Sequence, residues 1–137
     1  MNNNEERTLS IIKPDAVERN LENNIKNFFL NNSLRIADSK KIQITKEEAE
    51  EFYKIHQSKP FYNDLCSYLS SGPIVVIILE GQNAISENRR LMGATDPKKA
   101  EKGTLRFLYG ISIDKNSVHG SDSLDNAKKE IDFFFKN

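Results

Sequence analysis

The chain has 137 residues, of which 37% are hydrophobic and 29% charged, and its 20 Lys and Arg residues balance its 20 Asp and Glu residues. This composition is typical of one globular domain with a single core, which we expect to span residues 1–137, and it excludes a disordered chain. The neutral net charge argues against a protein that holds duplex nucleic acid through a basic face, so no specific nucleic acid is expected as a partner.

Cysteine content and hydropathy exclude further classes of protein. The single cysteine, Cys66, excludes an internal disulfide and a cysteine-rich zinc site. The longest apolar run, Ile74 to Leu79, is far shorter than the roughly 20 residues that span a membrane. The polar, Asn-rich first residues have no apolar segment after a basic start. We therefore expect a cytoplasmic enzyme or binding domain with no membrane partner.

The first part of the chain predicts a strand, a helix and a second strand. Thr8–Lys13 mixes β-branched and apolar residues and stops at Pro14, a residue that favours the first turn of a helix. Apolar residues then recur at helical spacing over Asp15–Leu30, which we expect to form one helix that ends at Asn31. The second strand candidate is Leu34–Ile44.

Two helices and a buried strand are predicted next. Thr45 and Glu48 form a capping-box pattern, which starts a helix that runs to about His56. After a break, Phe61–Leu69 resumes helical spacing. Ile74–Glu80 is continuously apolar and β-branched, which is typical of a strand buried on both faces.

The last part of the chain predicts a helix, a loop, a strand and a helix. Asn83–Met92 is predicted as a short helix, and Gly93–Gly110, with its glycines and many charges, as a long ordered loop. Ile111–His119 contains a short final strand, and Ser123 caps an amphipathic helix through Phe135. Helices that fall between about four strands predict an α/β sandwich of the ferredoxin-like type, with helices packed on a four-stranded antiparallel sheet.

His119 is the strongest candidate for chemistry. It lies in the segment Asn116–Ser123, just before a Gly-Ser-Asp-Ser turn that should open the last helix. A neutral imidazole near pH 7 is a good nucleophile and could accept a transferred group. This segment alone leaves open the alternative of a loop histidine that only forms hydrogen bonds.

An imidazole that accepts a phosphoryl group needs cations that bind and orient the phosphate chain. The sequence has neither G-x-x-x-x-G-K-[ST] nor G-x-G-x-x-G, so side chains must build such a site. Lys13 ends the first predicted strand, Arg89 lies in the short helix, and Thr95 and Arg106 lie in the predicted loop. Each of them taken alone is more often a surface residue.

These candidates lie inside segments that resemble the nucleoside diphosphate kinase family. The resemblance covers nearly the whole chain in the family's order, and the histidine segment Asn116–Ser123 (NSVHGSDS) is its most specific part. The other matching segments are residues 7–15, 49–53, 59–61, 71–73, 79–81, 90–97, 103–106, 126–127 and 130–131.

The resemblance implies a ping-pong kinase, which moves the γ-phosphate of a nucleoside triphosphate to a nucleoside diphosphate through a phosphohistidine intermediate. In the family, the histidine that matches His119 carries the phosphate. The glutamate that matches Glu130 is expected to orient the imidazole ring by a hydrogen bond. Lys13 and Tyr53 match catalytic positions beside the transferring phosphate, and Lys13 also reaches the sugar.

The remaining site residues that the resemblance implies contact the nucleotide. The phosphate-chain ligands are matched by Arg89, Thr95 and Arg106. Asn116 matches a contact to the ribose. Phe61 matches the ring on which the base stacks, with Ile113 on the other face of the base. Stacking of this kind tolerates all common bases.

The resemblance also implies Mg²⁺ as a cofactor and self-association as a homotetramer or homohexamer. The metal ion is expected to arrive bridging phosphate oxygens, so no dedicated metal site is predicted. Asn20, Glu22 and Asn23 occupy a stretch where the family usually has two glycines and packs against other subunits. Because asparagine tolerates left-handed backbone better than most residues, we expect a different turn or a longer helix there.

A second departure follows Arg106. Phe107 and Leu108 replace a small residue and an aspartate that the family usually has at these positions. That aspartate is expected to pin the loop by hydrogen bonds. We therefore expect an active but less robust enzyme, whose melting temperature rises on the change Leu108→Asp.

The second histidine and the C-terminal phenylalanines are not expected to bind a ligand. His56 is expected to be a surface histidine, and Phe133–Phe135 to belong to the core or to a subunit contact. The alternative function is a ferredoxin-like nucleotide-binding regulatory module without catalysis, against which the intact candidate residues argue. Single-stranded nucleic-acid binding through exposed aromatic residues lacks the basic stripe that it requires.

Overall fold

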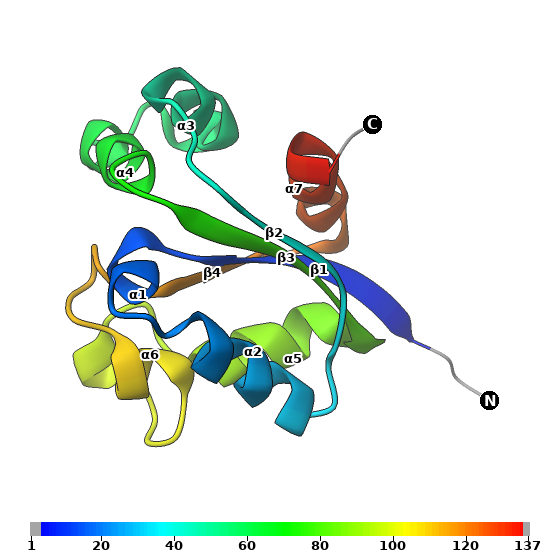
Figure 1. The fold of residues 1–137 in the computed structure, drawn as a ribbon. Helices are drawn as coiled ribbons and strands as arrows, with labels where there is room; N and C mark the ends of the chain where they lie inside the picture. The colour runs from blue at the N-terminus through cyan, green and yellow to red at the C-terminus, as the bar shows by residue number, and fades with distance from the viewer. Residues whose placement is uncertain (1–3, 136–137) are drawn as a thin grey trace.

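A four-stranded antiparallel sheet in the order β2-β3-β1-β4 forms the centre of the structure (Figure 1). The structure, a computed structural model, describes residues 4–135. Its strands are β1 (Glu5–Ile12), β2 (Arg35–Ile42), β3 (Ile74–Gln82) and β4 (Val118–Gly120). The ferredoxin-like sheet with helices packed on it, predicted from the sequence, is confirmed.

Two helical layers cover the two faces of the sheet, as Figure 1 shows. One layer holds α1 (Pro14–Glu18), α2 (Glu22–Asn31), α5 (Ala84–Met92) and α6 (Leu105–Tyr109). The other layer holds α3 (Lys46–Phe52), α4 (Tyr62–Leu69) and α7 (Leu124–Phe135). Short 3₁₀ turns lie at Lys54–His56 and Pro97–Lys99. No helix within the described residues is both long and apolar enough to cross a bilayer.

β3 contributes side chains to the two hydrophobic cores, one on each face of the sheet. Val75 and Ile77 point into the layer of α1, α2, α5 and α6, whereas Ile74 and Val76 point into the layer of α3, α4 and α7. All four side chains are buried, because successive residues of a strand face opposite sides and both sides are covered. The prediction of a strand buried on both faces is confirmed.

The predicted single helix over Asp15–Leu30 is wrong, because the chain turns between α1 and α2. Asn20 adopts a left-handed backbone conformation with φ 61°. The backbone N–H of Leu21 then bonds the carbonyl of Ala16 and closes the turn. An asparagine thus makes the turn at which the family usually has glycine, as the tolerance of asparagine for this conformation allows.

The remaining differences concern the boundaries of elements. The predicted loop Gly93–Gly110 contains α6, whose first turn is capped by the Thr104 hydroxyl. Because α6 has only five residues, it is too short to show a repeated helical spacing, and the sequence pattern does not reveal it. The capping box of Thr45 and Glu48 is confirmed, although α3 ends at Phe52 rather than near His56.

Candidate active site

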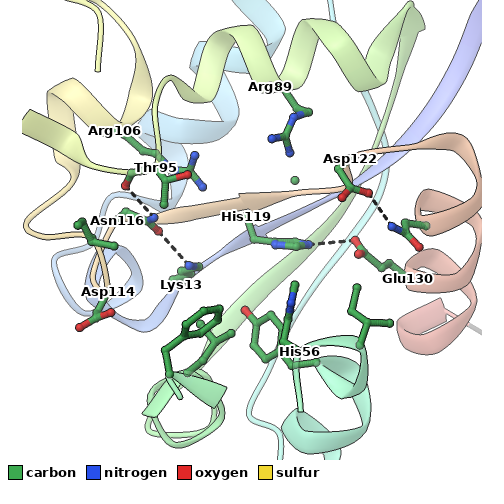
Figure 2. A pocket seen from close by; sticks show the side chains of 17 residues that line it. Lys13, His56, Arg89, Thr95, Arg106, Asp114, Asn116, His119, Asp122 and Glu130 are labelled. Carbon is green, nitrogen blue, oxygen red and sulfur yellow. Dashed lines mark hydrogen bonds and ion pairs between the residues drawn. The ribbon is translucent and has the colours of Figure 1, made fainter. Parts of the chain in front are cut away.

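A pocket of about 520 Å³ opens at one end of the sheet (Figure 2). Its walls come from the end of β1, the α3–α4 connection, α5, the segment around α6, β4 and α7. Every predicted site residue lines it: Lys13, Tyr53, Phe61, Arg89, Thr95, Arg106, Ile113, Asn116, His119 and Glu130. Residues spread over more than a hundred positions of the sequence therefore meet in one cavity.

Strand pairing explains why the two ends of the chain meet here. β4 pairs with β1 so that His119 lies opposite Ile11. Lys13 directly follows β1, and its backbone N–H bonds the carbonyl of Ser117 at 2.8 Å. The pairing of the two strands and this hydrogen bond thus fix the lysine and the histidine relative to each other.

His119 is oriented by a carboxylate on α7. Its Nε2 atom lies 3.0 Å from Oε1 of Glu130, and Oγ of Ser121 donates to the same oxygen at 2.7 Å. An ionised carboxylate only accepts hydrogen bonds, so Nε2 carries the proton of the neutral ring. Nδ1 is then the basic nitrogen, and no other residue of the range 4–135 makes a hydrogen bond with it.

Two aromatic rings fix the plane of the imidazole. Phe52 contacts the His119 ring edge to face, with 5.5 Å between centroids, and Tyr53 lies at 6.4 Å in the same kind of arrangement. Burial, followed by the nearby charge of Glu130, raises the pKa of the Tyr53 phenol. Tyr53 therefore keeps its proton and offers a hydrogen-bond donor to an anion in the pocket.

Lys13 is a buried ammonium group. Its side chain is 6% exposed, and Nζ donates to Oδ1 of Asn116 at 2.9 Å. Burial, and then the charge of Arg106, lowers the pKa of Lys13 to about 8. A buried cation with so little compensation is stabilised by any anion that enters the pocket.

Arg106 is held by backbone carbonyls. Nη1 donates to the oxygen of Gly93 at 3.0 Å, and Nη2 to that of Val118 at 2.9 Å. Burial, and then the charge of Arg89, lowers the pKa of Arg106 to about 10, so the guanidinium is still charged at neutral pH. These two bonds form although Leu108 stands where the family usually has aspartate, and the effect of Leu108 on stability stays a prediction.

Arg89 on α5 and Asp122, which lies between β4 and α7, both line the pocket (Figure 2). The amide of Asn126 donates a hydrogen bond to Oδ1 of Asp122 at 2.6 Å. This bond lowers the pKa of the Asp122 carboxyl, and the positive charge of Arg89 lowers it further. The guanidinium of Arg89 makes no hydrogen bond or ion pair with the residues that the structure describes, although its backbone carbonyl accepts from Gly93. Its neighbour Arg90, by contrast, is paired with Glu87 at 2.7 Å.

His56 is a site residue that the sequence interpretation missed. It was expected at the surface, but it is half-buried, lines the pocket, and has a buried Nδ1 without a hydrogen-bond partner among residues 4–135. Its ring lies 6.0 Å from that of Phe61 and 6.3 Å from that of Tyr53. Its place between these two predicted site residues in the sequence was the indication that could have found it.

The pocket contains too few oxygen ligands for a metal site built by protein alone. Asp114 and Asp122 line it together with Glu130, whose Oε1 is already bonded to His119 and Ser121. Within the described residues no three His, Cys, Asp or Glu side chains come together in a way that could hold a metal ion. Asp114 and Asp122 are the pocket carboxylates that could approach a divalent cation carried by a ligand.

Comparisons with known proteins agree with this geometry. The sequence pattern of the family described as nucleoside diphosphate kinase matches residues 6–137. A nucleoside diphosphate kinase of a Nitratiruptor species is 59% identical over 130 residues, which are 95% of either chain. One from Campylobacter jejuni subsp. jejuni serotype O:6 is 57% identical over 131 residues, or 96% of either chain.

Solved structures give the same result. The nucleoside diphosphate kinase of Aquifex aeolicus superposes with a TM-score of 0.94 at 39% identity, covering 97% of this chain and 96% of that one. That of Encephalitozoon cuniculi superposes with a TM-score of 0.93 at 38% identity, covering 96% and 90%. The alternative of a regulatory module without catalysis is not favoured. The chain belongs to the nucleoside diphosphate kinase family of phosphotransferases.

Proposed function

We propose that this chain transfers the γ-phosphate of a nucleoside triphosphate to a nucleoside diphosphate, with His119 as the group that carries the phosphate between them. The observation that supports this most strongly is the orientation of His119. Glu130 binds Nε2, and the remaining ring nitrogen lies in a pocket that also contains Lys13 and two arginines. A nucleophile beside clustered cations is what phosphoryl transfer requires.

The first half-reaction forms a phosphohistidine. The Nδ1 lone pair of His119 attacks the γ-phosphorus while the bond from that phosphorus to the β–γ bridging oxygen breaks, and the nucleoside diphosphate leaves. The proton on Nε2 stays between the ring and Glu130. Because the phosphorylated ring carries a formal positive charge, the carboxylate of Glu130, 3.0 Å away, stabilises it.

The second half-reaction reverses the first one with a different nucleoside diphosphate. A terminal oxygen of its β-phosphate attacks the phosphorus, and the nitrogen–phosphorus bond breaks with the electron pair returning to Nδ1. One pocket serves both nucleotides in turn, so donor and acceptor need not bind at once. No separate general base is needed, because neither step removes a proton from the attacking atom.

The positive side chains hold the phosphate chain. Lys13, Arg89 and Arg106 neutralise its charge, with Tyr53 and Thr95 adding hydroxyl donors and His56 an imidazole nitrogen. The two arginines differ in freedom, because Arg106 is fixed by carbonyls whereas Arg89 is exposed at the pocket mouth. Arg106 is therefore suited to the transferring phosphoryl group, and Arg89 to the entering chain.

The nucleoside end of the ligand lies between Phe61 and Ile113. Phe61 is 46% exposed and Ile113 56% exposed, which makes them an open apolar clamp rather than a closed base pocket. Such a clamp reads the face of a base and not its edge, so all common bases are accepted. The amide of Asn116, which is tied to Lys13 and to the Thr95 carbonyl, is positioned to contact the ribose.

Mg²⁺ is the cofactor that we propose, bound to the phosphates of the incoming nucleotide. When bound, it supplies charge neutralisation and orientation of phosphate oxygens. Asp122, which lines the pocket and has a lowered pKa, is the residue that would help to hold the ion.

Assembly and location are part of the same proposal. A homotetramer or homohexamer of single-domain chains in the cytoplasm is the state that we expect. Exposed apolar side chains on α6 and just beyond it, Phe107, Leu108 and Ile111, support self-association.

Steady-state kinetics with two nucleotides test this function. We expect GTP formation from ATP and GDP to give parallel double-reciprocal lines when both concentrations vary, since the phosphate resides on the enzyme between substrates. His119→Asn should lower kcat by about 10⁴-fold or more, while the unfolding transition stays close to that of the unmodified chain. Intersecting lines would show that both nucleotides bind together and would reject the ping-pong scheme.

A further inference from the structure

A strained turn precedes β4, the strand that contains His119. The backbone N–H of Val118 bonds the carbonyl of Asn116 at 2.9 Å, so Ser117 is the central residue of a three-residue γ-turn. Its φ is 73°, in the left-handed region that a residue with a Cβ rarely adopts, and it is completely buried. Turns of this hand are strained, and such strain persists only where the surrounding structure holds it.

The hydroxyl of Ser117 binds a buried carboxylate on α1. Its Oγ lies 2.7 Å from Oδ2 of Asp15 and 3.0 Å from the carbonyl oxygen of Tyr109. A hydroxyl has one proton, and the closer, charged acceptor receives it. Nη2 of Arg19 donates to the same hydroxyl at 3.2 Å, so Ser117 Oγ has partners on both sides.

Asp15 is itself fixed from several directions. It is 5% exposed, and Nη2 of Arg19 lies 3.0 Å from its Oδ2. The hydroxyl of Tyr68 donates to its Oδ1 and accepts from its backbone N–H at 2.9 Å. The charge of Arg19 and these hydrogen bonds compensate the burial of the Asp15 carboxylate. The carboxylate is therefore held in one position, where it accepts from the Ser117 hydroxyl.

The turn supplies hydrogen-bond partners to Lys13 and Arg106, two buried cations that line the pocket. The carbonyl of Ser117 accepts the backbone N–H of Lys13 at 2.8 Å, and the side chain of Asn116, the preceding residue, binds Lys13 Nζ. The carbonyl of Val118, the following residue, accepts from Arg106 Nη2. Any relaxation of the turn therefore moves the partners of Lys13 and of Arg106 together.

We propose that Asp15 and the hydroxyl of Ser117 are positioning residues for phosphoryl transfer. Their hydrogen bond holds the γ-turn in its strained form and so keeps Asn116, Lys13 and Arg106 aligned on the nucleotide. Neither residue lines the pocket, so both act through other residues. This inference rests on the proposed function, since it concerns the geometry in which a nucleotide meets His119.

The test compares two phosphate donors for His119. ATP needs the aligned cations, whereas phosphoramidate is a small donor that needs only an accessible imidazole. For Ser117→Ala we expect the rate of His119 phosphorylation by ATP to fall about 10- to 100-fold, as misalignment of bound groups does. The rate with phosphoramidate should change less than about twofold, because Glu130 still orients the ring.

Three further variants make the result specific. Ser33→Ala is the matched control, because Ser33 has a nearly identical φ of 71° but is exposed on a distant turn, and its rates should not change. Asp15→Asn should resemble Ser117→Ala, and the double variant should be no slower than the slower single variant, as expected for one shared interaction. Ser117→Gly removes the hydroxyl and the left-handed strain together, so its ATP rate should fall less than that of Ser117→Ala. Asp15→Asn breaks the same hydrogen bond and keeps the inference testable if Ser117→Ala does not fold.

The outcomes separate this inference from the proposed function. An unchanged ATP rate in Ser117→Ala or in Asp15→Asn would overturn the positioning role, as would equal losses with both donors or additive effects in the double variant. Failure of ATP to phosphorylate the unmodified chain at His119 would instead overturn the proposed function.

Discussion

Nε2 of His119 lies 3.0 Å from Oε1 of Glu130, and this pair joins the β4 edge of the sheet to α7. The pair selects the tautomer, since a carboxylate accepts and the ring nitrogen beside it must donate. It also supplies negative charge where a phosphorylated imidazole needs it. One hydrogen bond thus serves both the free enzyme and its intermediate.

Glu130→Gln is expected to lower kcat by about 100-fold, in the range of a lost positioned acid or base. The amide can present N–H instead of oxygen to Nε2, and it carries no charge to stabilise the phosphorylated ring. Single-turnover formation of phosphohistidine from ATP measures the effect. Asp132→Asn, an exposed change on the same helix, is the control and should leave the rate as it is. Equal rates in both variants would remove Glu130 from the mechanism.

Two neighbouring arginines offer a matched pair. Arg89 faces the pocket, whereas Arg90 is paired with Glu87 on the surface. We expect Arg89→Gln to raise KM for ATP about 10- to 100-fold, because a charge-assisted phosphate contact is lost. Arg90→Gln removes the same charge one residue away, outside the pocket lining, and should leave KM for ATP as it is. A similar rise in KM for both variants would mean that only general electrostatics matters.

Lys13 is expected to destabilise the nucleotide-free protein. Folding lowers its pKa from the usual 10.5 to about 8, so the unfolded chain binds more protons between these pH values. The free energy of unfolding should therefore rise with pH from about 8 to about 10.5, and the charged lysine should cost about 1 to 3 kcal/mol at pH 7. Lys13→Met should unfold at a higher temperature at pH 7, be inactive, and lose this pH dependence.

The control for Lys13 is Lys128→Met, which removes an exposed lysine on α7. It should keep the rise in stability above pH 8, because its pH dependence still comes from Lys13. Thermal unfolding of both variants and the unmodified chain at several pH values gives the comparison. A Lys13→Met protein that melts below the unmodified chain at pH 7 would contradict the assigned burial cost.

The sequence predicted the sheet and the pocket because both depend on strong local patterns. The continuous apolar run of β3 and the capping box of Thr45 specify their elements without long-range information. Most of the predicted site residues lie within the matching segments, with Arg89 and Ile113 outside them, so the resemblance and not the composition predicted them. Their convergence in one cavity follows from the antiparallel pairing of β1 with β4.

What the sequence could not show depends on single backbone conformations and tertiary contacts. The left-handed Asn20 splits a run whose apolar spacing is helical throughout. The γ-turn at Ser117 and its bond to Asp15 join residues 102 positions apart. His56 carries no pattern of its own, and only the packing of the α3–α4 connection brings it into the pocket.

Leu108 gives a test of a departure from the family. Its side chain is 49% exposed, so replacing it forfeits little buried apolar area. We expect Leu108→Asp to raise the melting temperature by about 2 °C, equivalent to about 0.5 kcal/mol from a hydrogen bond within the loop. Differential scanning calorimetry checks this, and an unchanged or lower melting temperature would reject the stabilising role of aspartate.

The most direct test of the central claim is to locate the phosphate on the protein after incubation with γ-labelled ATP. The chain has only two histidines, so His119→Asn and His56→Asn form a complete pair of variants. The account predicts an acid-labile, base-stable label that persists in His56→Asn, is absent from His119→Asn, and is discharged quantitatively by any nucleoside diphosphate. A label that survives in His119→Asn, or one that no nucleoside diphosphate removes, would contradict it.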